Sequence, residues 1–320
     1  MSWLITGGAG YIGSHIAHSF VSEGEEIVVL DNLSTGLFER VPSGVPFYEG
    51  DITSELVYEK IFSQEKIEGV INLAALKSVE ESMRLPDEYR RVNTYGLENT
   101  LKIAIKYGVE IFLQTSTAAV YGNVEGGVAF EFSETNPISV YGSTKLDAEE
   151  ILNSYIDSGK INGVSLRYFN VVGANTPQLR DTSNSNLFPI AMNDLRAKRA
   201  PNVFGHDYPT LDGSCIRDYV HVQDVADAHL LAVRALRADS LPRALNIGAG
   251  KGLSVFQVLK AMQTYLGTQA EVNIRPRREG DPASLIANVD LAWKHLGFRA
   301  KRNLEEMVAS TFPVTRSNPQ

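Results

Sequence analysis

A glycine-rich turn between an apolar strand and a helix is the feature that most constrains how this chain can fold. The turn reads T-G-G-A-G-Y-I-G over residues 6–13, and Gly8, Gly10 and Gly13 satisfy the spacing G-x-G-x-x-G. In this spacing the first glycine permits a tight turn, the second lets the backbone approach a pyrophosphate, and the third lets the helix pack closely on the strand. Because a helix N-terminus also offers unpaired N–H groups to an anion, the turn predicts a dinucleotide-binding site.

An acidic residue after the second apolar segment narrows the choice of dinucleotide. Asp31 follows residues 26–30 and lies 18 residues after Gly13, where a carboxylate can bind the hydroxyls of the adenosine ribose. Since the same carboxylate repels a 2′-phosphate, the pattern favours NAD over NADP. Asp51 ends another short strand, and two interpretations stay open for it: it reaches the adenine edge, or it caps the helix predicted from residue 53.

Strand and helix patterns alternate through the first half of the chain. Short runs rich in Val, Ile and Leu predict buried strands, and periodic amphipathic segments between them predict helices, which together indicate an α/β fold with a doubly wound parallel sheet of the Rossmann type. The predicted strands are 3–6, 26–30, 47–51, 69–73, 110–113 and 163–168, and the predicted helices are 13–22, 53–64, 89–107 and 141–158.

The pattern changes after about residue 170. Irregular polar stretches there separate the predicted helices 187–197, 222–238, 254–266 and 290–297, with a short strand at 244–247. We therefore predict an NAD-binding domain over residues 1–170, joined by part of 218–245, and a smaller mixed α/β substrate domain over 171–320. A length of 320 residues agrees with two domains.

Composition excludes several classes of protein. The formal net charge of −8 argues against broad nucleic-acid binding, which needs a basic surface. The single cysteine, Cys215, allows no intramolecular disulfide, and the chain has neither a basic leader nor an apolar run of membrane-spanning length. His15 and His18 have no acidic or cysteine partners nearby in sequence, so no metal site is predicted. We expect a soluble cytoplasmic protein that binds neither nucleic acid nor membrane.

A tyrosine and a lysine lie four residues apart on the predicted helix 141–158. At this spacing Tyr141 and Lys145 share one helix face. An ammonium beside the phenol, together with the positive nicotinamide of NAD, would lower the pKa of the tyrosine from about 10 and make it a general base. Such a pair is common by chance. The dinucleotide turn and Thr117, at the end of a predicted strand, support its interpretation as a catalytic pair.

Several longer motifs add a family resemblance. They are the opening at residues 6–14, the D-N-L at 31–33, the S-x-A-x-V-Y-G at 116–122, the L-R-Y-F-N at 166–170 and the two stretches at 204–213 and 217–222. From residue 4 to about residue 298 the chain resembles the extended short-chain dehydrogenases/reductases, and within that family the UDP-glucose/UDP-galactose 4-epimerases. The long stretch at 204–213 is typical of the epimerases rather than of the whole family.

The resemblance implies an NAD-dependent isomerase that interconverts UDP-glucose and UDP-galactose. The sugar is oxidised at C4, the 4-keto intermediate rotates, and it is reduced again on its other face. Tyr141 would be the base, Lys145 would orient the nicotinamide ribose, and Thr117 would bind the sugar hydroxyl. The other cofactor-binding residues would be Gly7, Gly10, Tyr11, Ile12, Gly13, Asp31, Asn32, Asp51, Ile52, Leu73, Ala74, Ala75, Lys77, Asn93 and Tyr168. The substrate would also contact Lys77, Asn170, Asn186, Leu187, Arg217, Arg278 and Asp281. A homodimer through a four-helix interface, built from residues 89–107 and 141–158, is implied too.

Some positions depart from the family pattern or leave alternatives open. Asn72 stands where histidine is usual, and Glu80 stands where glycine is common. Thr117 is followed by two alanines rather than the acidic pair of the related dehydratases, which disfavours dehydration. A 4-epimerase for UDP-N-acetylhexosamines or UDP-uronates and a non-catalytic NAD-binding regulator stay open. Leu285 stands at a gate beside the sugar C2 substituent, and its intermediate size predicts glucose/galactose preference with some turnover of N-acetylated sugars.

Overall fold

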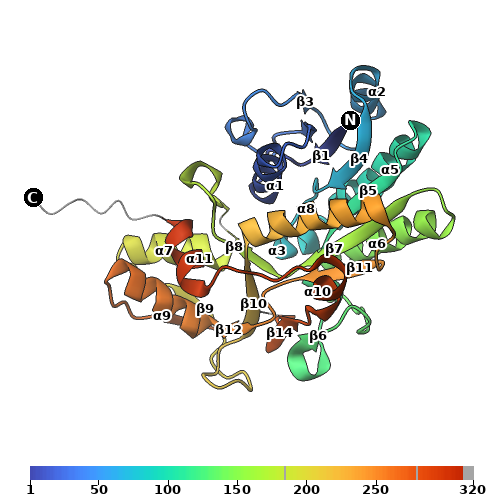
Figure 1. Cartoon of the computed structure of the whole chain (residues 1–320). Helices are drawn as coiled ribbons and strands as arrows, with labels where there is room; N and C mark the ends of the chain where they lie inside the picture. Colours follow the sequence, from blue (N-terminus) through green and yellow to red (C-terminus); the bar gives the residue numbers. More distant parts are fainter. Residues whose placement is uncertain (184, 279, 313–320) are drawn as a thin grey trace, which may run out of the picture.

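A seven-stranded parallel sheet forms the centre of the larger part of the molecule (Figure 1). The computed structural model describes residues 1–183, 185–278 and 280–312. The strand order is β11-β7-β5-β4-β1-β2-β3, so the order reverses between β1 and β4, and open sheets of this kind bind ligands at that point. The strands are β1 (Ser2–Thr6), β2 (Ile27–Asp31), β3 (Phe47–Glu49), β4 (Ile67–Asn72), β5 (Ile111–Thr117), β7 (Asn162–Tyr168) and β11 (Ala244–Ile247).

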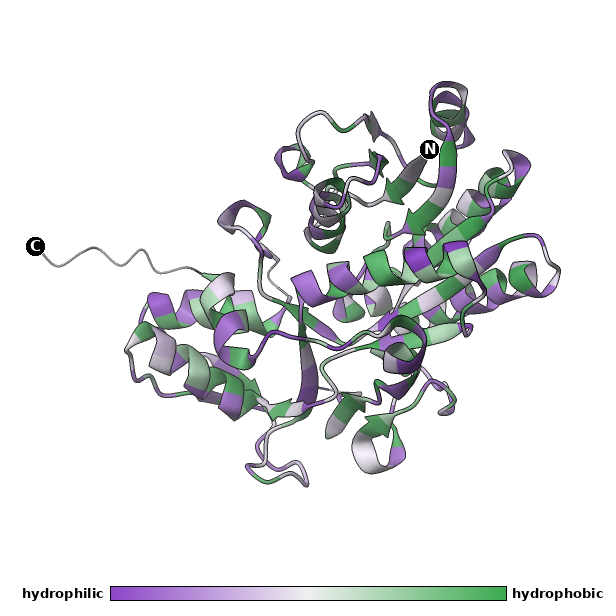
Figure 2. Cartoon of the chain, viewed as in Figure 1, coloured by the Kyte–Doolittle hydropathy of each residue, from purple (hydrophilic) through white to green (hydrophobic). Residues whose placement is uncertain are grey.

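Helices cover both faces of this sheet, because its strands are apolar on both sides (Figure 2). One face is buried by α1 (Tyr11–Ser22), α8 (Val222–Ala238) and α10 (Asp290–Leu296). The other is buried by α2 (Glu55–Gln64), α5 (Gly96–Lys106) and α6 (Val140–Asp157). The doubly wound Rossmann-type fold predicted from the sequence is confirmed.

The predicted helix at residues 89–107 is a composite. Short helices α3 (Val79–Arg84) and α4 (Pro86–Tyr89) lead into a π-helical stretch, η2 (Arg90–Tyr95), which continues into α5. Hydrophobic periodicity does not separate a π turn from an α turn in a short window, so the sequence predicted one uniform helix. Wider turns of this kind are frequent at functional sites, and this one contains Asn93.

A smaller mixed α/β part follows in the C-terminal half. Its main sheet has the order β12-β10-β14-β6, with β8 also paired to β10, and β10 is antiparallel to β12 but parallel to β14 and β8. These strands are β6 (Val128–Ala129), β8 (Asn170–Val172), β10 (Ile216–His221), β12 (Gly252–Ser254) and β14 (Ser284–Ala287). Beside them lie the parallel pair β9 (Asn202–Phe204) and β13 (Asn273–Arg275), and the helices α7 (Leu187–Arg196), α9 (Val255–Leu266) and α11 (Leu304–Thr311).

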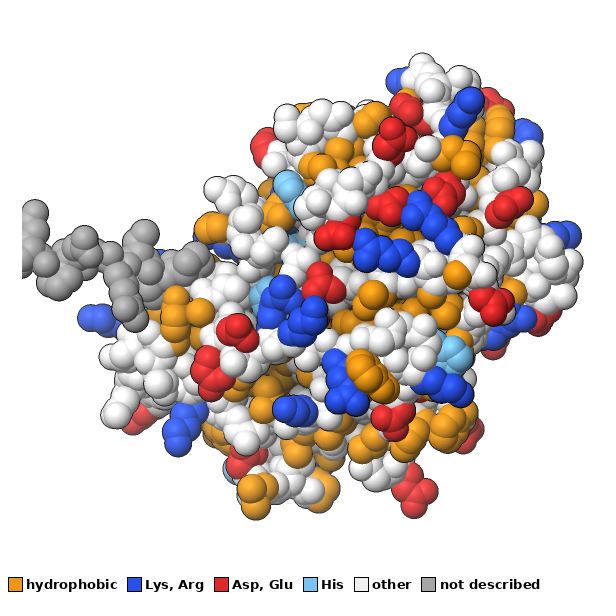
Figure 3. All heavy atoms as spheres, in the orientation of Figure 1, with side chains coloured by type: hydrophobic (Ala, Val, Ile, Leu, Met, Phe, Trp, Pro, Cys, Tyr) orange, Lys and Arg blue, Asp and Glu red, His pale blue; other side chains and the backbone are white. Residues whose placement is uncertain are grey.

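The chain passes between the two parts several times. Strand β6 leaves the first half to pair with β14, whereas α8 and β11 return to the large sheet. Single 3₁₀ turns occur at η1 (Phe38–Arg40), η3 (Ala118–Val120), η4 (Glu125–Gly127) and η5 (Pro177–Leu179). Acidic and basic side chains are interspersed over the face seen in Figure 3. Among the described residues, no helix is both long enough and apolar enough to cross a membrane.

Candidate active site

The glycine turn leaves the first turn of α1 open to a ligand. Gly7 has φ +70°, and a Cβ there would lie 2.8 Å from the Ala74 nitrogen. A Cβ on Gly13 would lie 2.1 Å from the Gly7 carbonyl oxygen. The sequence assigned the tight turn to Gly8, but the left-handed residue is Gly7. Gly10 is the N-cap of α1 and has no side chain to cap it, so the backbone cradle fits a dinucleotide pyrophosphate.

Asp31 is held against this turn at the end of β2. Its carboxylate accepts hydrogen bonds from the Ala9 nitrogen at 3.0 Å and the Leu33 nitrogen at 2.8 Å. Burial raises the pKa of this carboxyl, while the backbone donors act in the opposite sense. The side chain is therefore fixed beside the turn, where the ribose contact was predicted.

Asp51 has a local structural role. Its Oδ1 accepts from both the nitrogen and the hydroxyl of Thr53, at 2.9 and 2.7 Å, just before α2. Asn32 reaches its other oxygen at 3.4 Å. Ile52 is buried, and its carbonyl accepts from the Asn99 side chain. These contacts close the turn before the helix: α2 begins at Glu55 and its N-cap is Ser54, so the capping interpretation of Asp51 is wrong. The adenine contact stays a prediction.

Tyr141, Thr117 and Lys145 come together at the ends of β5 and α6. The N-cap Ser139 accepts from the Gly142 nitrogen, and the Tyr141 nitrogen donates to Ser82 Oγ of α3 at 3.1 Å, so the first turn of α6 is held from two sides. The Thr117 hydroxyl is hydrogen-bonded to the Tyr141 phenol.

Burial dominates the environment of the phenol in the chain alone. Burial raises the pKa of Tyr141, and the Thr117 hydrogen bond acts in the opposite sense. In the chain alone the cost of burying a phenolate dominates, and the lowering predicted with NAD bound stays a prediction. Lys145 donates to the Thr115 carbonyl oxygen at 3.0 Å, and burial lowers its pKa to about 8 while Glu149 raises it.

A cavity of about 410 Å³ opens between the two parts of the molecule beside this group. It brings together many of the predicted residues from distant parts of the chain. The predicted residues that line it are Tyr11, Ile12, Lys77, Thr117, Tyr141, Tyr168, Asn170, Asn186, Leu187, Arg217, Asp281 and Leu285.

Arg217 supplies a positive charge to the wall of this cavity. Its Nη1 donates to the carbonyl oxygens of Ile216 and Pro282 at 2.8 and 2.7 Å, and its Nη2 lies 3.2 Å from Asp281 Oδ1. That Nη2 is buried and has no partner with good hydrogen-bond geometry. An anion entering the cavity would satisfy it.

The segment around Lys77 is fastened by the π turn. Asn93 Oδ1 accepts from the Leu76 nitrogen at 2.8 Å, and its Nδ2 donates to the Leu76 carbonyl at 3.0 Å and to Thr144 Oγ1 at 3.1 Å. The π turn thus links the Lys77 segment to α6. Upstream, Leu73 and Ala74 donate to Thr6, while Ala75 continues the same segment.

A buried polar chain passes beneath the glycine turn and contains the unusual Asn72. Thr6 Oγ1 donates to Asn72 Oδ1 at 2.7 Å, and Asn72 Nδ2 donates to Gln114 Oε1 at 2.9 Å. Gln114 Nε2 then donates to the Thr115 carbonyl at 2.8 Å, the same oxygen that Lys145 reaches. Sequence reasoning noted Asn72 only as a departure, since its partners lie on other strands.

Two predicted residues make other contacts. The Arg278 side chain is exposed, and its guanidinium lies 3.9 Å from the centre of the Phe204 ring. Arg278 does not line the described cavity. Its diphosphate contact stays a prediction. Tyr168 faces the cavity, and its hydroxyl bonds His229 Nε2 at 2.6 Å.

Sequence reasoning missed other cavity residues. Tyr219, Pro282 and Ile138 line it, and Asp181 holds the Asn186 side chain in place at 2.5 Å. Tyr219 lies inside a motif that the sequence had already singled out. The others carry no signal in one sequence, because their role depends on long-range pairing.

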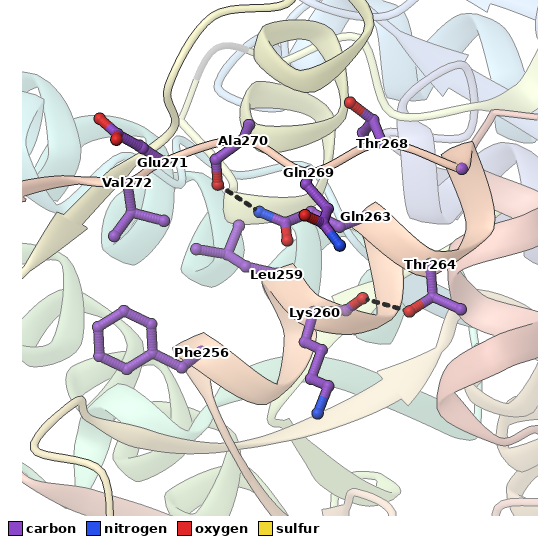
Figure 4. Close-up of a pocket in the computed structure, with 11 residues that line it drawn as sticks. Phe256, Leu259, Lys260, Gln263, Thr264, Thr268, Gln269, Ala270, Glu271 and Val272 are labelled. Carbon is purple, nitrogen blue, oxygen red and sulfur yellow. Dashed lines mark hydrogen bonds between the residues drawn. The ribbon is translucent and has the colours of Figure 1, made fainter.

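A second hollow, of about 1010 Å³, lies on α9 and the following loop (Figure 4). Its lining includes Phe256, Leu259, Lys260 and Glu271, and Gln263 Nε2 donates to the Ala270 carbonyl across it at 2.9 Å. None of the described lining residues is a buried titratable or nucleophilic group, so the catalytic candidate is the smaller cavity. The described residues also contain no group of three side chains that could hold a metal ion.

Comparison with known proteins agrees with this geometry. The sequence profile of the NAD dependent epimerase/dehydratase family matches residues 3–248. The chain is 39% identical to a UDP-glucose 4-epimerase of Erwinia amylovora, with 100% of this chain and 99% of that protein covered. It is 37% identical to a UDP-glucose 4-epimerase of Bacillus subtilis, with 99% and 98% covered.

Solved structures give the same result. The UDP-glucose 4-epimerase of Brucella ovis in complex with NAD superposes with a TM-score of 0.92 and 36% identity, covering 97% of this chain and 96% of that one. The Thermotoga maritima UDP-glucose 4-epimerase with UDP-glucose has a TM-score of 0.87 and 34% identity, with 97% of both chains covered. The cradle of glycines and Asp31 fits the cofactor that the family description names. The chain belongs to the NAD dependent epimerase/dehydratase family.

Proposed function

We propose that this protein is an NAD-dependent UDP-glucose 4-epimerase, an isomerase that interconverts UDP-glucose and UDP-galactose. One observation carries the proposal: the hydrogen-bonded pair Tyr141 and Thr117, with Lys145 buried behind it, opens into the same cavity as Arg217. The cavity thus offers both a group for proton transfer and a cation for a diphosphate.

Some of the cavity residues would bind the nucleotide of the substrate, and others would act on its sugar. Arg217, whose buried Nη2 makes only the ion pair with Asp281, would bind the diphosphate, because a guanidinium matches phosphate oxygens well. Asn170, Asn186 and the start of α7 at Leu187 would bind the rest of the nucleotide. Holding the nucleotide at this end leaves the sugar free to turn beside Tyr141.

Tyr141 would take the proton from the sugar 4-hydroxyl and return it after the sugar has turned. Thr117 would orient that hydroxyl, and Lys145 would stabilise the phenolate. When bound, NAD supplies the acceptor and donor of the hydride at C4. The cavity between the two parts of the molecule would keep water from the 4-keto sugar.

The sugar specificity follows from Leu285 on β14. This residue is 8% exposed, lines the cavity, and lies directly beside Arg217 in the strand register. We propose that its bulk favours UDP-glucose and UDP-galactose over N-acetylated sugars. The family resemblance, rather than a contact, supports this assignment.

Turnover measurements with purified protein test the proposal. We expect conversion of UDP-galactose to UDP-glucose to exceed that of UDP-N-acetylgalactosamine. If the protein converts only UDP-N-acetylgalactosamine, the proposed substrate is wrong and the N-acetylated sugar takes its place. Tightly bound NAD with no conversion of any UDP-sugar would favour a non-catalytic regulator instead.

We also propose a homodimer formed through the helices around residues 89–107 and 141–158. Tyr95 on η2 is 61% exposed, and Met83 on α3, which precedes the first of these segments, is 60% exposed, so apolar surface is free for a partner on this side. Sedimentation of the wild-type protein should give the mass of two chains. Tyr95→Glu should give one chain, and Leu56→Glu on α2, a still more exposed apolar site elsewhere, should not change the mass.

A further inference from the structure

Glu149 lies one turn beyond Lys145 on α6, so Tyr141, Lys145 and Glu149 follow each other on one helix face at intervals of four. Glu149 is 2% exposed and Lys145 is 4% exposed. A buried carboxylate is costly unless it is paired and hydrogen-bonded, and the resemblance assigned no role to this one.

An arginine and a serine satisfy Glu149. Arg167 Nε lies 2.9 Å from Oε1, and its Nη2 lies 2.6 Å from Oε2, which makes a bidentate pair. Ser116 Oγ donates to Oε1 at 2.5 Å, and Ser116 lies between Thr115, which accepts from Lys145, and Thr117. Arg167 Nη1 also donates to the Tyr121 hydroxyl and the Glu131 carbonyl, which fixes the guanidinium.

From these contacts we propose that Glu149, locked by Arg167 and Ser116, is a positioning residue that keeps Lys145 charged and in place behind Tyr141. The proposal rests on the proposed epimerase function for its consequence in turnover. The effect of Glu149 on the charge of Lys145 does not depend on that function, because both residues belong to the chain itself.

The surroundings of Lys145 leave this task to Glu149. Its carboxylate is the charge that raises the pKa of Lys145 against the effect of burial. Arg90 on η2 is a charged side chain from an element packed against α6. It lowers the pKa of Asp147 and is not among the groups that shift the pKa of Lys145. Three other titratable groups are linked to this set: Arg167 pairs with Glu149, Tyr121 accepts from Arg167, and Tyr141 raises the pKa of Tyr168.

The sign of the effect follows from the charges. If Glu149 becomes neutral, Lys145 loses its proton at lower pH, because the buried ammonium has lost its counter-charge. Tyr141 then has less positive charge nearby than in the wild type over the pH range in which only the wild-type lysine is charged. Turnover, which needs the charged lysine, therefore fails at lower pH.

The test is Glu149→Gln in the NAD-loaded protein, with Glu150→Gln as the matched control. Glu150 is the exposed neighbour on the same helix, and its neutralisation should change nothing. For Glu149→Gln we expect the alkaline limb of the turnover profile to move down by about one pH unit, a typical effect of one nearby opposite charge. A uniform loss of rate with both limbs unmoved would overturn the proposal, because that is the result of a purely structural role.

A second readout does not need turnover. The gain in thermal midpoint caused by Lys145→Met, measured across pH in the wild-type and in the Glu149→Gln background, should begin to shrink at lower pH in Glu149→Gln, because it shrinks once the folded lysine loses its proton. An unmoved pH dependence would overturn the inference even if the epimerase proposal holds. If the wild type converts no UDP-sugar, the epimerase proposal fails, and this pH dependence still decides the inference.

Glu149→Gln leaves Arg167 unpaired and could impair folding. The double variant Glu149→Gln with Arg167→Met removes both charges together. We expect this variant to fold and its alkaline limb to lie between those of the wild type and Glu149→Gln. Wild-type limbs in the double variant would show that Glu149 serves only to pair with Arg167, and would overturn the proposal.

Discussion

Lys145 shares its hydrogen-bond acceptor, the Thr115 carbonyl oxygen, with a second donor, Gln114 Nε2. The two donors come from different elements: Gln114 belongs to β5, the strand that carries the carbonyl, and Lys145 belongs to α6, which packs on that strand. The carbonyl therefore stays satisfied if the lysine is removed. This separates the catalytic use of Lys145 from the stability of its surroundings.

Replacing Lys145 by methionine should abolish turnover and raise stability. Burial lowers the pKa of Lys145 from 10.5 to about 8, so keeping it charged at neutral pH costs on the order of 3 kcal/mol. Because the folded-state pKa lies below the unfolded one, this cost is full below pH 8 and disappears as the pH rises to about 10.5. Thermal unfolding at pH 7 should show a midpoint higher by a few degrees in Lys145→Met, and the difference should shrink at high pH.

Turnover should depend on pH in the opposite way. Since the reaction needs Lys145 protonated, the rate should fall as the pH rises through about 8. A pH profile of kcat with NAD-loaded protein checks this. A rate that stays flat to pH 10 would contradict the role given to the lysine.

Tyr141→Phe should keep the fold and the cofactor and lose the reaction. The phenol makes its hydrogen bond with Thr117, while the backbone nitrogen of residue 141 still donates to Ser82. Loss of a general base costs about 10²–10⁴-fold in rate. Turnover of UDP-galactose, with bound NAD measured in the same sample, tests both parts of this expectation.

Asn72→Leu should destabilise the protein by about 1–3 kcal/mol, because it leaves Thr6 and Gln114 without their buried partner. In a double-mutant cycle, Gln114→Leu should cost less in the Asn72→Leu background than alone, by more than about 0.5 kcal/mol. Urea unfolding measures both values. Strict additivity would mean that the two amides do not form one chain.

Leu285 should set the ratio of turnover between plain and N-acetylated sugars. Leu285→Ala enlarges the cavity wall and should raise the relative kcat/KM for UDP-N-acetylgalactosamine, and Leu285→Tyr should lower it. A change of this size in the volume of a pocket typically alters the ratio of kcat/KM between two substrates by about 10-fold or more. Neither variant should alter NAD retention, which serves as the control for folding.

Local patterns predicted the fold well because they depend on neighbouring residues. The glycine turn and Asp31 lie within one strand–helix–strand unit, so their spacing alone placed them together. Tyr141 and Lys145 were on one face because four residues make about one helical turn. Arg217 was found through the family resemblance, but its contact with Asp281 depends on the loop before β14, which sequence spacing does not reveal. The effect of burial on the pKa of Tyr141 was not predicted, because burial follows from the fold and not from the motif.

The passages of the chain between the two parts have a consequence for engineering. Strand β6 belongs to the first half in sequence but completes the sheet that carries Arg217 and Leu285, whereas α8 and β11 come late and cover the sheet that carries Tyr141's neighbours. Substrate selectivity therefore cannot be moved between relatives as one contiguous block. A chimera joined near residue 170 would separate β7 from its edge strand and β14 from β6, so working exchanges must be made loop by loop around the cavity.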